Sequence, residues 1–127
     1  MSRYKYVFLK HSLDTDLLMG QILTYEGVTE VKKFDAQIDI HMVTESFSID
    51  LTVSTEDDFN EDESAVLAWL KLKGVAFPCP TLFFHGHWSE LGATLVKQIT
   101  SQIRSQGDCV SLENDSFDVP ARGNPNL

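Results

Sequence analysis

The most regular part of the sequence is residues 34–54, which read FDAQIDIHMVTESFSIDLTVS. Apolar and polar residues alternate through both halves of this segment, and Thr44, Glu45 and Ser46 interrupt the alternation. A period of two is typical of strands that have one face on a core and the other in water. The segment therefore predicts two long antiparallel strands in a hairpin, with Asp35, Asp39 and Asp50 on the same exposed face.

Shorter patterns on both sides of this hairpin predict further strands and three helices. Runs of aromatic and β-branched residues indicate strands, and apolar residues at helical spacing, preceded by a cap residue and followed by glycine, indicate helices. The predicted strands are residues 4–9, 81–84 and 109–112, and the predicted helices are residues 15–26, 61–73 and 90–106. The expected fold class is α+β: an antiparallel sheet of four to five strands with a long central hairpin, and three helices packed mainly on one face.

The chain has the length of one domain, 127 residues, and 43% of them are apolar. We expect a single α+β domain over residues 1–113 and a flexible polar C-terminal tail over residues 114–127. The N-terminus lacks the apolar core of a signal peptide, and no apolar run approaches the roughly 18 residues of a membrane span. These features predict a cytoplasmic protein in which Cys79 and Cys109 are free thiols.

The negative charge of the chain is concentrated in one segment. The net charge is −9, and residues 34–70 contain ten Asp and Glu but no Lys or Arg. The rest of the chain has nine acids and ten bases, so this segment accounts for the whole imbalance. A focused negative field repels nucleic-acid phosphates and attracts basic protein surfaces. We therefore expect a basic protein partner and no direct binding of nucleic acid.

The candidate partner site combines the exposed face of the hairpin with the acidic run that follows it. Its residues are Asp35, Asp39, Asp50, Glu56, Asp57, Asp58, Phe59, Glu61 and Asp62. Phe59 lies within the acids, where it fits either an aromatic interface anchor or a side chain packed on the helix that follows. Asn60 and Glu63 have the spacing of a capping box, which is an alternative explanation for part of the run. A role of the acids in solubility alone is also open.

Metal binding and catalysis have weaker support in the sequence. Cys79, His85 and His87 are the candidate metal ligands, but no fourth ligand follows at a zinc-site spacing. Cys79 stands between Pro78 and Pro80, a poor setting for a nucleophile that needs backbone N–H groups around it. No phosphate-binding glycine loop or nucleophile elbow is present. We therefore expect no cofactor, no bound metal and no enzymatic activity.

In size, one-domain α+β build and concentrated acid, the chain resembles the small acidic inhibitors that bacteria and phages make against nucleases, above all bacterial toxin-immunity proteins. This resemblance implies a cytoplasmic protein, monomeric or weakly dimeric, that neutralises a basic, nuclease-like toxin by covering its active site. A phage-type inhibitor of a host defence complex fits the same features. Two other classes stay open: a small metal-binding protein or enzyme using Cys79, His85 and His87, and an adaptor subunit.

Overall fold

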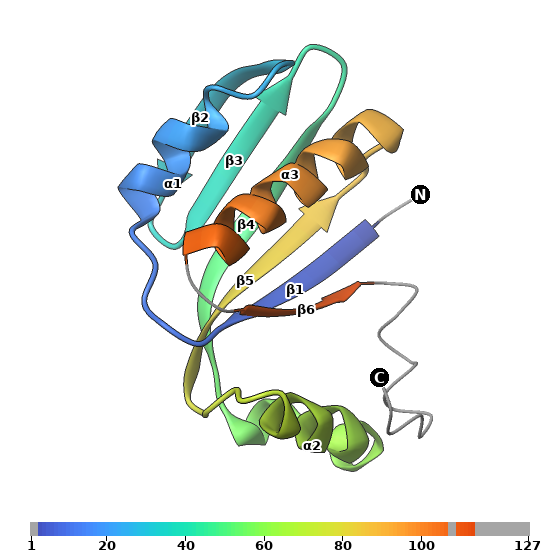
Figure 1. Cartoon of the computed structure of the whole chain (residues 1–127). Helices are drawn as coiled ribbons and strands as arrows, with labels where there is room; N and C mark the ends of the chain where they lie inside the picture. Colours follow the sequence, from blue (N-terminus) through green and yellow to red (C-terminus); the bar gives the residue numbers. More distant parts are fainter. Residues whose placement is uncertain (1–2, 107–108, 114–127) are drawn as a thin grey trace.

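Six antiparallel strands form one open sheet in the order β2-β3-β4-β5-β1-β6 (Figure 1). The computed structural model describes residues 3–106 and 109–113. The strands are β1 (Arg3–Leu9), β2 (Val28–Phe34), β3 (Gln37–Met42), β4 (Ser46–Ser54), β5 (Cys79–Gly86) and β6 (Cys109–Glu113), and the helices are α1 (Thr15–Ile22), α2 (Ser64–Leu72) and α3 (Glu90–Gln106). The α+β class and the central hairpin β3–β4 are confirmed, but the sheet has one strand more than the four to five expected.

The additional strand is β2, at the edge of the sheet beside β3. Its residues are half-buried or exposed, so its sequence lacks the strong alternation that marks β3 and β4. The strand predicted to begin at Phe34 begins at Gln37, because Phe34 ends β2 and Asp35 lies in the turn with φ 50°. Asp is one of the few residues that adopt this left-handed conformation readily. Asp35 is therefore at the tip of a hairpin, not on a strand face.

The two faces of the sheet are covered to different extents. Helices α1 and α3 lie side by side across one face (Figure 1) and bury a continuous core against β1, β3, β4 and β5. Val7 and Leu9 of β1 belong to this core, whereas Phe8 belongs to a second cluster with Val66 and Leu70 of α2. Because successive side chains of a strand point to opposite faces, α2 packs on the other face, at one end. Two of the three helices thus share the expected face.

The start of α3 is held by a residue from the β3–β4 turn. The Glu45 carboxylate accepts hydrogen bonds from the Ser89 backbone N–H (3.2 Å) and the Ser89 hydroxyl (2.6 Å). The Ser89 hydroxyl in turn accepts from the Leu91 N–H, so Ser89 caps this helix. Gly92 lets the two segments approach, because a Cβ at that position would overlap Trp88 and the Glu45 carboxylate.

Three other expectations concern the cysteines, membrane-spanning helices and the C-terminal residues. Cys79 and Cys109 are free thiols, as predicted. Among the described helices, none has the length and apolar character required to cross a membrane. The predicted tail, residues 114–127, lies outside the described residues, so its assignment stays a prediction.

A pair of Gly→Ala substitutions tests the packing at α3. Gly92→Ala should lower the free energy of unfolding by about 1–3 kcal/mol, because the new methyl group overpacks a buried site. Gly20→Ala is the matched control: Gly20 is an exposed residue inside α1, and a methyl group added there would meet no atom within 4 Å. This control should raise the free energy of unfolding by about 0.5–1 kcal/mol. Urea denaturation measures both, and equal stabilities for the two variants would contradict the close approach at Gly92.

Candidate protein-binding face

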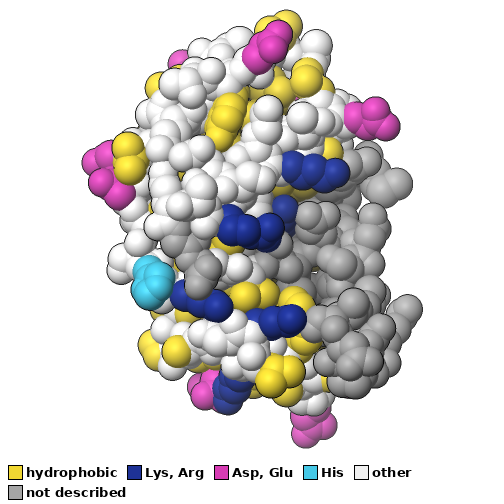
Figure 2. Space-filling model, in the orientation of Figure 1, with side chains coloured by type: hydrophobic (Ala, Val, Ile, Leu, Met, Phe, Trp, Pro, Cys, Tyr) yellow, Lys and Arg dark blue, Asp and Glu magenta, His cyan; other side chains and the backbone are white. Residues whose placement is uncertain are grey.

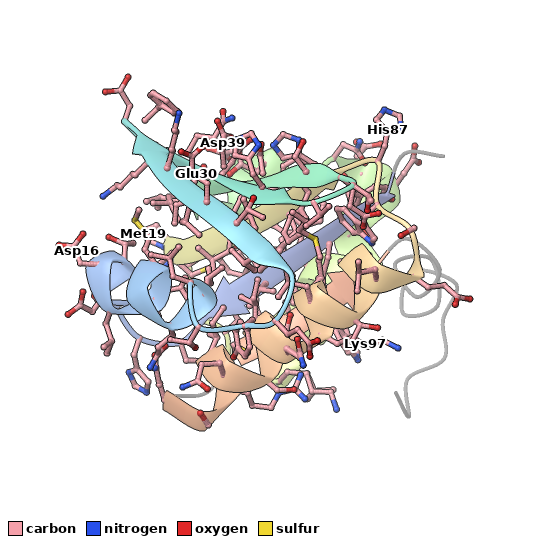
Figure 3. The ribbon with its side chains drawn as sticks, turned by 90° about the horizontal axis from the view of Figure 1, so that it is seen from above. Asp16, Met19, Glu30, Asp39, His87 and Lys97 are labelled. Carbon is pink, nitrogen blue, oxygen red and sulfur yellow. The ribbon has the colours of Figure 1, made fainter. Side chains whose placement is uncertain are left out.

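The two sides of the sheet differ in charge. On the side that carries α1 and α3, Lys and Arg side chains gather in the middle of the face and Asp and Glu lie at its margins (Figure 2). Lys97 and Arg104 of α3 are exposed there. Figure 3 shows Lys97 on this helix side and Asp39 on the opposite side of the sheet. Asp39 of the acidic segment is thus on the side away from these helices (Figure 3), whereas Glu45 of the same segment contacts the start of α3.

We refer to the side chains on the side away from α1 and α3 as the open sheet face. It comprises Tyr4, Tyr6, Gln37, Asp39, Ser48, Asp50, Phe83 and His85, which come from β1, β3, β4 and β5. All eight are half-buried. Their neighbours along each strand, such as Val7, Ile38, Ile49 and Phe84, point into the main core. Because side chains of a strand alternate between its two faces, the pattern that buries one set of residues in the core places these eight side chains together on the opposite face.

Aromatic rings form a row across β1 and β5 on this face. The Tyr6 and Phe83 rings are stacked with centroids 4.6 Å apart, and the Phe83 and His85 rings are stacked at 4.9 Å. Tyr4 contacts the edge of Tyr6 at 5.8 Å. Rings held by one another present a rigid apolar surface at little cost in side-chain entropy, which is typical of protein interfaces.

Carboxylates and their hydrogen-bond partners lie beside this aromatic row, on β3 and β4. Asp39 accepts a hydrogen bond from the Gln37 amide and another from the Ser48 hydroxyl, each at 2.7 Å. These two bonds lower the pKa of Asp39, the one from Gln37 most, and the nearby His41 and His85 imidazoles add to the effect. Asp39 is therefore an ionised carboxylate at neutral pH.

Asp50 connects the carboxylates to the aromatic row. Its Oδ1 lies 3.0 Å from Nε2 of His85, which stacks on Phe83. Both atoms are shielded from solvent, and the direction of approach does not meet hydrogen-bond geometry. This contact places the Asp50 carboxylate next to the ring at the end of the aromatic row.

The acidic run forms a turn at one end of the open sheet face. This acidic turn, residues 55–63, contains two 3-10 turns, η1 (Glu56–Asp58) and η2 (Glu61–Glu63). Asp58 accepts from the Thr55 backbone N–H at 2.7 Å, and Glu63 accepts from the Asn60 backbone N–H at 3.2 Å while Asn60 accepts from Glu63. All three bonds are capping interactions, and the capping box predicted at Asn60 and Glu63 is confirmed.

The other acids of this turn are exposed at its surface. Glu56 forms an ion pair with Lys71 of α2. Asp57, Glu61 and Asp62 are exposed, and their carboxylates accept none of the hydrogen bonds found between described residues. These three carboxylates are therefore available to a partner, whereas Asp58 and Glu63 also stabilise the turn.

Phe59 packs inside the chain. Its ring contacts the Phe8 ring at 6.2 Å and the Phe77 ring at 5.6 Å, within the cluster under α2. A groove of about 270 Å³ remains beside it, lined by Tyr6 and Phe8 as well as by Asp58 and Glu63. Of the two roles expected for Phe59, the structure supports packing, and the ring reaches the surface only as a wall of this groove.

The structure brings part of the predicted site together. Asp39 and Asp50 share the open sheet face, and Asp58 lies at its end, next to Phe59 and the other acids of the turn. Asp35 is at the distant tip of the β2–β3 hairpin. The aromatic row was not predicted from the sequence. The sequence signal for it was aromatic residues at every second position of two strands: Tyr4, Tyr6 and Phe8 in one, and Phe83 and His85 in the other. A strand face that is fully exposed to water does not require so many aromatic rings.

The three candidate metal ligands are not brought together. Cys79 and His85 are at opposite ends of β5, six residues or about 20 Å apart along an extended strand. Cys79 is buried, and burial raises the pKa of its thiol while a hydrogen bond to Thr81 opposes this change. Within residues 3–106 and 109–113, no three His, Cys, Asp or Glu side chains are arranged to hold a metal ion.

The Asp39 network predicts a dependence of stability on pH. The pKa of Asp39 is lowered by folding, so its contribution is complete above the ordinary carboxyl pKa of about 4 and disappears as the pH falls through the folded value. Asp39→Asn should therefore be less stable than the wild type at pH 7 and equally stable in strong acid. Asp57→Asn, with the same charge change on the acidic turn, is the control. Urea denaturation between pH 7 and pH 2 measures the difference, and a pH-independent loss would contradict the ionised hydrogen-bond acceptor.

Comparison with protein-family models, with curated protein sequences and with solved structures finds no match to this chain. The residues of the open sheet face and the acidic turn are therefore the basis for any statement on function.

Proposed function

We propose that this protein is an inhibitor that binds a basic protein partner through the open sheet face and the acidic turn. The observation that supports this most is the row of stacked aromatic rings beside the ionised carboxylate of Asp39, on a side of the sheet that α1 and α3 leave uncovered. Protein interfaces combine aromatic side chains that lose apolar area to water with charged groups that select the partner. Both kinds of group are present here on adjacent strands.

The negative charge of this surface favours a partner with a basic, phosphate-binding cleft. A nuclease needs a basic cleft, and a preformed acidic surface can occupy it and exclude the substrate. The same field repels nucleic acid itself, so it favours the nuclease over its substrate as the partner. We therefore assign the protein to the immunity type of function, in which a small acidic protein neutralises a basic, nuclease-like toxin.

Rigidity of the surface supports binding as a preformed unit. The rings are held by stacking, and Asp39 is held by hydrogen bonds from Gln37 and Ser48. A surface that is already ordered loses little conformational entropy on binding, which favours affinity. High affinity is needed by an inhibitor that competes with a polyanionic substrate for the same cleft.

The proposal is tested by capturing partners from the native host and measuring association kinetics with the purified partner. The association rate constant should fall about tenfold or more between 50 and 500 mM salt, because salt screens the attraction. The double variant Asp39→Asn/Asp50→Asn should associate about three- to tenfold more slowly than the wild type at low salt. Nuclease activity of the captured partner should be abolished by one equivalent of the wild-type protein.

The matched control is Asp16→Asn/Glu26→Gln, which removes the same charge from exposed positions in and after α1. This control should bind at nearly the wild-type rate, because its charges lie outside the proposed face (Figure 3 shows Asp16 at the end of α1). Equal rates at low and high salt, together with equal behaviour of the two double variants, would show that the acids serve solubility.

A further inference from the structure

The groove at the acidic turn is lined by both aromatic rings and carboxylates. It has a volume of about 270 Å³ and lies between β1, the end of β4 and the turn. The ring of Phe8 is almost fully buried at 3% exposure and forms the floor, and Tyr6 and Phe59 are half-buried beside it. Asp58 and Glu63 of the turn and Thr52, Val53 and Ser54 of β4 complete the lining. Aromatic rings and carboxylates around one cavity are the chemistry that selects an organic cation.

We propose that this groove receives the side chain of an arginine from the basic protein partner, so that it is the specificity pocket of the interface. This inference rests on the proposed function and names the group that the site recognises. A guanidinium stacks on aromatic rings, is weakly hydrated and presents its donors as a planar fork that matches carboxylates. The ammonium of lysine is more strongly hydrated and gains less from aromatic walls.

The carboxylates at the groove retain the capacity to bind a cation. The capping bonds use Oδ2 of Asp58 and Oε1 of Glu63, and the second oxygen of each carboxylate accepts none of the hydrogen bonds between described residues. None of the ion pairs between described residues involves either side chain, whereas the neighbouring Glu56 is paired with Lys71. The negative charge of Glu63 also reaches into the groove: after burial and Tyr4, it is the third cause that raises the pKa of the Tyr6 hydroxyl.

The groove is continuous with the proposed binding face. Tyr6 lines the groove and also stacks on Phe83 in the aromatic row, so an arginine in the groove would adjoin the open sheet face. The capping bonds hold Asp58 and Glu63 in place before a ligand arrives. A basic surface placed over the sheet could therefore insert one side chain here without a rearrangement of the turn.

The first experiment titrates the isotopically labelled full chain with a short peptide of glycine and serine that contains one central arginine, with acetylated and amidated ends. Amide chemical shifts of Thr52, Phe59 and Glu63 should move together and saturate in the millimolar range expected of a single side chain, a Kd of about 1–10 mM. The same peptide with citrulline, which is uncharged and nearly isosteric, should bind about tenfold more weakly. A lysine peptide that binds as well as the arginine peptide would overturn the selection of a guanidinium.

Substitutions that remove charge but keep the capping bonds distinguish an effect of charge on binding from an effect on folding. Asp58→Asn/Glu63→Gln retains an oxygen acceptor at each capping position and should weaken arginine-peptide binding about tenfold or more. Asp57→Asn/Glu61→Gln removes the same charge from exposed positions of the same turn and should change it less than about twofold. Equal weakening by both pairs would mean a diffuse acidic surface and would overturn the pocket.

Three further outcomes are distinguishable from these. The chain itself contains Arg122, beyond the described residues. If Arg122→Gln raised the affinity for the arginine peptide, the occupant of the groove would be this chain's own arginine and the proposal of a partner side chain would be overturned. If the peptide bound only away from the groove while the captured partner still depended on salt, Asp39 and Asp50, the pocket would fail and the proposed function would stand. If the groove bound the peptide but no basic partner depended on the open sheet face, the proposed function would fail alone.

Discussion

The pairing of β5 with β4 on one side and β1 on the other is the constraint on which the rest of this structure depends. Residues 79–86 of β5 match residues 47–54 of β4, and six of them also match β1, so β5 joins the central hairpin to the N-terminal strand. The register aligns Phe84 with the main core and Phe83 with the opposite side. A shift of one residue would exchange these two sides and remove both the core and the aromatic row.

The fold could be predicted from the sequence where one face of an element is fully buried. The alternation in β3 and β4 is strong because Ile38, Ile40 and Ile49 have no exposed surface and their neighbours are polar. Some helix ends followed from local chemistry: Asp14 caps α1, and Gly74 adopts positive φ just after α2. The predicted end of the first helix at residue 26 was wrong, because α1 ends at Ile22 and Gly27 lies in the turn before β2. Strand β2 was missed because it is an edge strand whose side chains are mostly in water, so burial imposes little pattern on it.

The candidate site was harder to predict because its two halves are far apart in the sequence. The position of Asp39 and Asp50 on a common face followed from the hairpin alone. That Tyr6 stacks on Phe83 depends on the long-range pairing of β1 with β5, which no local pattern specifies. The acidic run was ambiguous for a different reason: Asp58 and Glu63 cap turns and also line a groove, and spacing in the sequence reveals only the first role.

The contact between Glu45 and Ser89 has a consequence for the order of folding. The residue that completes the N-terminal cap of α3 is 44 positions away, in the turn of the central hairpin. A helix of 17 residues can form its hydrogen bonds locally, but its first turn cannot gain this carboxylate until β3 and β4 have paired. Completion of α3 is thereby delayed until a contact of high sequence separation is made, which is the kind of step that slows folding. The β3–β4 turn therefore couples the pairing of the two central strands to the completion of the helix that covers the core.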